Sequence, residues 1–220
     1  GENEVVVLER EDTGKRNLQG LDKPILDSLG IDKNKPEKQQ RNQTGSPILE
    51  EGDILLLQNE VNRLPYMVDK AYEKGMQIAL NPSPFNEKLN DVDMSKISYF
   101  LMNEVEGEQI TGFSEPEKII DRVVELYPEA KIVLTLGNDG AIYADKNVRY
   151  HQPIFKVQAV DTTAAGDTFT GYFLAGIIEG MEIPEILKMS AKASSIAVTR
   201  QGAVPSIPYR EEVLASLKED

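Results

Sequence analysis

The sequence contains no cysteine, no tryptophan and one histidine, His151. Without cysteine the chain can form neither disulfides nor Cys-based metal sites, and one histidine cannot build a His-rich metal site. We interpret His151, in a Tyr-His-Gln-Pro loop, as a surface residue. No apolar run approaches the roughly 20 residues of a membrane-spanning helix, and no signal peptide is visible. These absences predict a cytoplasmic protein without a membrane partner.

Positive charge is also scarce, because 24 Lys and Arg residues stand against 37 Asp and Glu residues, for a formal net charge of −13. A negative surplus repels nucleic acid and anionic membranes, so neither is an expected partner. It does not exclude ATP, since local backbone amides and a bound cation can offset the overall charge. A chain of 220 residues is long enough for one domain with a full core and a small appendage.

The chain divides near residue 50. A short β-prone run precedes residues 10–46, which are mostly polar, and residues 32–46 contain none of Ala, Val, Ile, Leu, Met, Phe, Trp and Tyr. From residue 51 onward, short apolar runs alternate with segments of helical periodicity. The expected strands are 53–57, 77–80, 97–102, 131–136 and 157–160, with a hairpin of 141–144 and 148–150; the expected helices are 61–74, 115–126, 166–177, 184–198 and 209–218. This alternation predicts an α/β fold with a mostly parallel sheet flanked by helices.

Polar residues follow the expected strands at the point where each strand ends. They are Gln58 and Glu60, Asn81, Asn103 and Glu106, Thr135 and Gly137, and residues 161–167. In open α/β sheets, ligands bind beyond the carboxyl ends of the strands. The spacing therefore predicts one active-site edge.

The most informative stretch is VQAVDTTAAGDTFTGYFLAG, residues 157–176. It predicts a strand, a turn containing Gly166 and the start of a helix. Free backbone N–H groups and the helix dipole at such a junction suit phosphate. The carboxylate of Asp167 could accept a proton from an attacking hydroxyl. An Asp at a helix start also serves as an ordinary cap, so the residues alone leave both interpretations open.

Three further motifs have a functional and a purely structural interpretation. Asn103 and Glu106 form an N-x-x-E string that could orient magnesium-bound water or could cap a helix. The TLGNDG segment at residues 135–140 could approach a nucleotide closely or could be a hairpin turn. Residues 197–206, AVTRQGAVPS, could hold a cation with helix-end carbonyls or could be a C-cap and loop.

Together, VDTTAAGDTF, N-x-x-E, TLGNDG and IAVTRQGAVPS resemble the signatures of the ribokinase family of sugar kinases. The resemblance implies that Asp167 is the catalytic base, that Gly166 forms part of the anion hole and that Glu106 places magnesium. It assigns the ATP site to Asn103, Thr135, Leu136, Gly137, Asn138, Asp139, Gly140, Gly166 and Asp167, and a potassium site to Asp161, Thr163, Ala197, Arg200, Gly202 and Ser206. Ala191 departs from the family, where a polar residue often faces adenine.

The resemblance also implies a reaction: transfer of a phosphoryl group from ATP to the 5-hydroxyl of D-ribose, with magnesium and potassium. Glu60 matches a sugar ligand, and family members are usually homodimers joined by β-sheet lids. The first strands and most of the lid have no match here, so residues 1–50 are expected to be a lid remnant and a polar loop. Residues 51–220 are expected to be the nucleotide-binding and catalytic domain. Two alternatives stay open: a non-catalytic nucleotide-binding module, and a kinase of another sugar or nucleoside.

Overall fold

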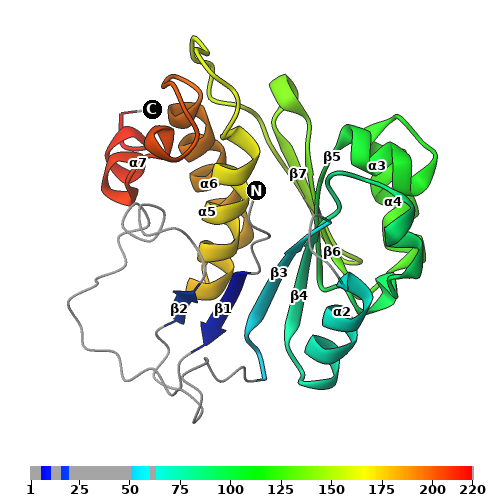
Figure 1. The fold of residues 1–220 in the computed structure, drawn as a ribbon. Helices are drawn as coiled ribbons and strands as arrows, with labels where there is room; N and C mark the ends of the chain where they lie inside the picture. Colours follow the sequence, from blue (N-terminus) through cyan, green and yellow to red (C-terminus); the bar gives the residue numbers. More distant parts are fainter. Residues whose placement is uncertain (1–5, 11–15, 20–50, 60–62, 220) are drawn as a thin grey trace.

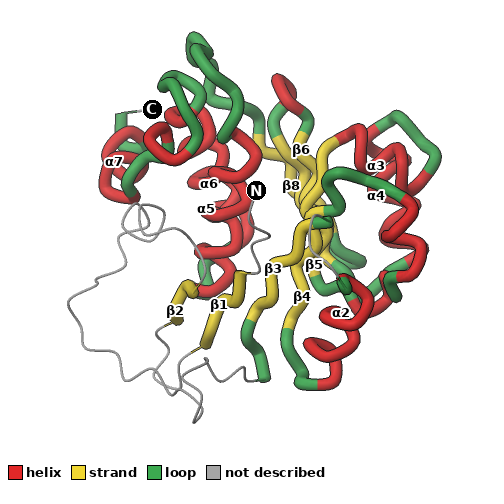
Figure 2. Tube along the Cα trace, in the orientation of Figure 1, coloured by secondary structure: helices red, strands yellow, loops and turns green. Residues whose placement is uncertain are grey.

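The computed structural model describes residues 6–10, 16–19, 51–59 and 63–219. These residues form a central β-sheet with a layer of helices on each face (Figure 1). Figure 2 shows the same arrangement, with the strands between the two groups of helices. The α/β class expected from the sequence is therefore confirmed.

The sheet has eight strands in the order β2-β1-β3-β4-β5-β6-β7-β8. Strand β3 pairs parallel with β4, β4 with β5, and β5 with β6. The strands on either side of this group pair antiparallel, so the sheet is mixed. The strands are β1 (Val6–Arg10), β2 (Arg16–Gln19), β3 (Ile54–Gln58), β4 (Gln77–Asn81), β5 (Tyr99–Asn103), β6 (Lys131–Thr135), β7 (Ala141–Ala144) and β8 (Arg149–Gln152).

Helices α2 (Leu64–Glu73), α3 (Glu104–Thr111) and α4 (Pro116–Leu126) lie on one side of the sheet, and α5 (Ala165–Glu179), α6 (Ile183–Ala197) and α7 (Arg210–Ser216) lie on the other (Figure 1). Four short 3₁₀ helices connect these elements: η1 (Glu87–Asp91), η2 (Met94–Lys96), η3 (Gly137–Asp139) and η4 (Val204–Ser206). Helix α4 shows why these segments fold as they do. Proline occupies its first turn, and Ile119, Ile120 and Val123 recur on one buried stripe.

Each face of the sheet has its own hydrophobic core. On the α5–α6 face, Tyr99 and Tyr143 pack edge-on or tilted against Phe173 of α5. On the other face, Phe100 packs against Tyr127 among the side chains of α2 and α4. Because both faces are covered, the central strands are apolar almost throughout, as the buried run of β5 illustrates.

The register of the parallel strands gathers their carboxyl ends at one edge. Gln58 of β3 pairs with Asn81 of β4, and Asn103 of β5 pairs with Thr135 of β6. Polar side chains predicted at strand ends are therefore neighbours in the sheet. Glu60, the predicted sugar ligand, lies outside the described residues.

The expected strand at residues 157–160 is wrong. These residues are exposed and belong to the irregular connection between β8 and α5. Apolar β-branched residues form a strand only where a neighbouring strand offers backbone partners, and the sheet ends at β8. The amide of Val160 instead donates to the carbonyl of Val198, at 2.7 Å. A smaller correction concerns His151, which is exposed as expected but lies in β8 rather than in a loop.

No helix among the described residues is long and apolar enough to cross a bilayer. Strands β1 and β2 form an antiparallel pair that extends the main sheet beyond β3. Whether residues 1–50 correspond to a lid remnant stays a prediction.

Candidate active site

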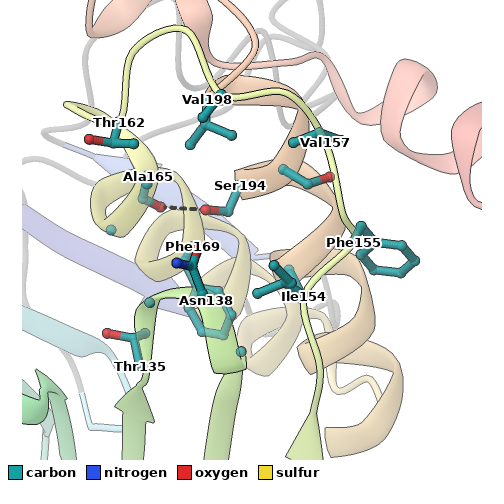
Figure 3. A pocket seen from close by; sticks show the side chains of 16 residues that line it. Thr135, Asn138, Ile154, Phe155, Val157, Thr162, Ala165, Phe169, Ser194 and Val198 are labelled. Carbon is teal, nitrogen blue, oxygen red and sulfur yellow. Dashed lines mark hydrogen bonds between the residues drawn. The ribbon is translucent and has the colours of Figure 1, made fainter.

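A pocket of about 290 Å³ lies where the β6–β7 turn, the β8–α5 connection, the start of α5 and the end of α6 meet (Figure 3). Its walls are largely apolar, with Ile154, Phe155 and Val157 from the β8–α5 connection and Phe169 from α5. A mostly apolar cavity with a few polar groups is the usual form of a small-molecule site.

The pocket brings together residues that are far apart in the sequence. Thr135, Gly137, Asn138 and Gly140 from the TLGNDG segment line it together with Gly166 of α5. Four members of the predicted ATP set, Asn103, Leu136, Asp139 and Asp167, do not line the pocket. Leu136 is buried in the core on the opposite face of the sheet. Asp139 is exposed, and its carbonyl accepts a hydrogen bond from Nε2 of His151 at 2.8 Å.

Gly140 fixes the shape of the turn that forms one pocket wall. Its φ of 98° and ψ of −132° lie in a region that only glycine occupies without strain. A Cβ atom there would lie 2.0 Å from the carbonyl oxygen of Gln152. The close approach of β7 to the end of β8 therefore requires glycine at this position.

The start of α5 carries the predicted catalytic residues. Gly166 and Asp167 lie in its first turn and are exposed, and a Cβ atom on Gly166 would meet nothing within 4 Å. No side chain caps this helix. The opening beside Gly166 leaves room for a ligand at the positive end of the helix dipole, where an anion is favoured.

A hydrogen bond fixes the start of α5 to the end of α6. The hydroxyl of Ser194 donates to the carbonyl of Ala165 at 2.9 Å, as the dashed line in Figure 3 shows. Helices α5 and α6 run antiparallel and pack closely. Glycine at position 176 permits this close approach, since a Cβ atom there would lie 2.7 Å from Cγ1 of Ile186. The first turn of α5 is thus held against a rigid neighbour.

Asp161 organises the loop that precedes α5. Its carboxylate accepts hydrogen bonds from the hydroxyl and amide of Thr163, at 2.6 and 3.0 Å, and from the amide of Gly202, at 3.0 Å. These hydrogen bonds lower the pKa of Asp161 to about 2. The bond from the Thr163 hydroxyl contributes most, followed by the two backbone amides. Three of the six predicted potassium ligands are thereby joined directly.

The other three predicted potassium ligands lie at the end of α6, which is Ala197, and in the α6–α7 connection, which contains Arg200 and Ser206. The carbonyl of Ala197 accepts from the amide of Arg200 at 3.0 Å, and the guanidinium of Arg200 pairs with Glu212. The hydroxyl of buried Ser206 donates to the carbonyl of Ala203 at 2.6 Å. The six positions offer oxygen atoms, which suit a hard cation. Within the described part of the chain, no group of three or more His, Cys, Asp or Glu side chains could hold a metal on its own.

The pKa of Asp161 leads to a prediction about acid stability. A depressed pKa stabilises the folded chain above the ordinary value of 3.8, and this contribution is lost as pH falls toward about 2. Asp161→Asn should therefore be less stable than the parent at neutral pH. The difference in unfolding free energy should shrink toward zero as pH falls to about 2. Urea unfolding at a series of pH values, in potassium-free buffer, measures this difference. A difference that stays constant with pH would contradict the assignment, and exposed Asp91→Asn provides the control.

Asn103 and Glu106 form a complete capping box at the start of α3. The Asn103 side chain accepts from the amide of Glu106 at 3.0 Å, and the Glu106 carboxylate accepts from the amide and the side-chain nitrogen of Asn103, at 2.8 and 3.1 Å. The motif therefore caps the helix, as its structural interpretation predicts. Glu106 is nevertheless not a free surface residue, because it is only 8% exposed. Neither residue lines the pocket.

The end of α6 forms a wall of the pocket that the sequence patterns did not predict. Ser194, Ser195 and Val198 line the pocket beside Ala191. Two adjacent serines near a helix C-terminus are the signal that could have identified this wall. Nearby, the ammonium group of Lys192 lies 4.6 Å from the ring centroid of Phe155, which helps to fix the β8–α5 connection against α6.

The fold and the pocket define a class: open α/β proteins with a ligand site at the carboxyl edge of parallel strands and beside a helix N-terminus. The model of the pfkB family carbohydrate kinases matches residues 50–210, more than half of the chain, so the chain belongs to this family.

Individual relatives agree with this family. The chain is 33% identical to a ribokinase of Haemophilus influenzae over 174 residues, which cover 76% of this chain and 56% of the relative. It is 27% identical over 171 residues to a deoxyribokinase of Salmonella typhi, with 72% and 53% covered. A solved structure of Arabidopsis thaliana ribokinase with ribose and ATP matches with a TM-score of 0.66 at 30% identity, covering 75% of this chain and 55% of that one. The chain thus spans about half the length of the curated relatives it matches.

Proposed function

We propose that this chain is the nucleotide-binding and catalytic part of an ATP-dependent sugar kinase that phosphorylates the 5-hydroxyl of D-ribose. The observation that supports this most strongly is the apolar pocket next to the exposed first turn of α5. A nucleotide base fits the pocket, and its phosphates then extend toward Gly166 and Asp167. Pocket, helix N-terminus and carboxylate follow one another in the order that phosphoryl transfer requires.

In the proposed reaction, the sugar hydroxyl oxygen attacks the γ-phosphorus of ATP. A new O–P bond forms while the bond to the β-phosphate oxygen breaks and ADP leaves. The hydroxyl proton passes to the carboxylate of Asp167, which acts as general base. Backbone amides at the start of α5, including that of Gly166, stabilise the charge on the transferred group.

Two cations belong to the proposal. Magnesium in kinases is usually held by one or two carboxylates, by water and by the phosphates of the nucleotide, and it neutralises phosphate charge. Glu106 fits an indirect role through a bridging water, because it is largely buried and each of its oxygens accepts a hydrogen bond from Asn103. Potassium would be held by Asp161, Thr163, Ala197, Arg200, Gly202 and Ser206, whose oxygen atoms suit that ion.

The proposed phosphoryl acceptor is inferred from the names of the relatives and from the assignment of Glu60. Relatives that carry the names ribokinase and deoxyribokinase make a pentose the first choice of acceptor. We propose Glu60 as a sugar ligand. Another pentose, a hexose or a nucleoside is the alternative acceptor, and a panel of acceptors separates them. A homodimer in the cytoplasm, with small-molecule partners and no nucleic acid, completes the proposal.

A second candidate function is a nucleotide-binding module without catalysis. It is favoured by the pocket itself, whose mostly apolar walls beside a helix start suit nucleotide binding whether or not transfer follows. Such a module would bind ATP in the same pocket without transferring a phosphoryl group.

The deciding experiment measures ATP consumption by the purified chain with D-ribose, magnesium and potassium, against a control without ribose. Ribose-dependent ADP formation is the expected result. Thermal stabilisation by ATP without any product would replace the kinase with the binding module. A chain that neither binds ATP nor turns it over would remove both functions.

A further inference from the structure

The wall that α6 gives to the pocket carries two serine hydroxyls, from Ser194 and Ser195, beside the methyl group of Ala191. Ser195 is almost fully buried and Ser194 partly so. Figure 3 shows Ser194 directed from α6 toward the first residue of α5. Polar side chains that line a mostly apolar pocket are the ones that fix the orientation of a ligand.

Both hydroxyls have already committed their only hydrogen. Ser194 donates to the carbonyl of Ala165 at 2.9 Å, and Ser195 donates to the carbonyl of Lys192 at 2.7 Å. A carbonyl can only accept, so the direction of both bonds is fixed by chemistry. Each serine oxygen is left with lone pairs and no proton to offer. The two serine side chains of the α6 wall therefore offer acceptors and no donor.

The other polar side chains of the pocket do not change this character. The hydroxyl of Thr135 lies 3.5 Å from the carbonyl of Met102, which can only accept from it. Asn138 and Thr162 are exposed at the pocket opening, where water can satisfy either a donor or an acceptor. Among the side chains of the pocket, discrimination between ligands thus falls to Ser195, which is buried, and to Ser194, which is partly buried, since an unpaired polar group costs most where water is excluded.

We infer that Ser194 and Ser195 make this pocket select a nucleotide base that presents an exocyclic amine over one that presents an oxo group at the same position. Adenine and cytosine offer an N–H donor that the two serine oxygens can bind. Hypoxanthine and uracil place a carbonyl oxygen there, against lone pairs. The inference rests on the proposed function, because it assumes that the pocket holds the base of the phosphoryl donor.

ATP and ITP provide the sharpest comparison, because the base of ITP has an oxo group and a ring N–H where adenine has its amine and a ring acceptor. Isothermal titration of the purified chain should give a dissociation constant for ITP that is about tenfold higher or more, the size of one hydrogen bond to an otherwise buried group. Equal affinity for the two nucleotides would overturn the inference.

Serine-to-alanine variants test which residues are responsible. The double variant Ser194→Ala and Ser195→Ala should lower the ITP-to-ATP ratio of dissociation constants to about one. The matched control is Ser190→Ala, which removes a similar hydroxyl of α6, bonded to the carbonyl of Ile186 at 2.8 Å and absent from the pocket wall. Loosening of α5 would weaken the binding of both nucleotides together. Only a changed ITP-to-ATP ratio of dissociation constants therefore supports a specificity role. An unchanged ratio in the double variant overturns it.

The same titrations separate this inference from the proposed function. Selective binding of ATP without ribose-dependent turnover would support the inference and remove the kinase activity. Ribose-dependent turnover together with equal affinity for ATP and ITP would support the kinase activity and contradict the inferred base selectivity. Binding of neither nucleotide would contradict the kinase activity and the base selectivity.

Discussion

Asp167→Asn should lower kcat for ribose phosphorylation by about a thousandfold, while the affinity for ATP stays within a few-fold of the parent. The loss corresponds to removal of a general base, which typically contributes two to four orders of magnitude. The amide keeps the size of the side chain, and Asp167 does not line the pocket, so nucleotide binding is retained. Steady-state kinetics and ATP titration on the same preparation measure the two quantities.

Glu185→Gln is the matched control for this substitution. Glu185 is also an exposed carboxylate in the first turn of a helix, but that helix is α6, whose start lies at the opposite end of the α5–α6 pair. It therefore removes one helix-terminal charge without touching the proposed site. A variant at position 167 that retains parental turnover would refute the base assignment. Equal loss in both variants would point to a general effect of charge.

Gly140→Ala should lower the unfolding free energy by about 3 kcal/mol, because it combines a strained backbone conformation with a steric clash. The added Cβ would lie 2.0 Å from a backbone carbonyl, which cannot rotate away as a flexible side chain would. Since the residue also forms a pocket wall, ATP affinity should fall in the fraction of protein that stays folded. Urea unfolding and ATP titration measure the two effects.

Gly112→Ala isolates the contribution of backbone conformation. Gly112 has a φ of 77° at the end of α3, and a Cβ atom there would meet nothing within 4 Å. Its replacement should cost about 1 kcal/mol, the usual penalty for alanine in a left-handed conformation. Equal costs at positions 112 and 140 would mean that the end of β8 moves away from the new methyl group.

Periodicity predicted most of this fold because the signals were local. The apolar run DILLL and the amphipathic stripe of α4 carry their own secondary structure, and both cores are built from such segments. The order of the polar residues at strand ends also followed from the sequence, since parallel strands align their carboxyl ends. The register that pairs Asn103 with Thr135 is the structural form of that prediction.

The failures share one cause, namely contacts that no local pattern encodes. Residues 157–160 have a strong strand propensity, but the sheet has no free position for them beyond β8. Spacing could not decide whether Glu106 is an exposed cap or a buried one, because the answer depends on how α3 packs. The hydrogen bond from Ser194 to Ala165 joins residues 29 positions apart, and only the α5–α6 packing brings them together.

The chain order of the sheet has a consequence for synthesis on the ribosome. Strands β3 to β8 all leave the exit tunnel before α5, the helix that covers one of their faces. Until then the side chains of Tyr99, Val133 and Tyr143 on that face have no partner from α5 or α6. A nascent chain that stalls near residue 160 would therefore display a broad apolar surface, of the kind that chaperones bind and that drives aggregation. The same helices that complete the pocket also end this period of exposure.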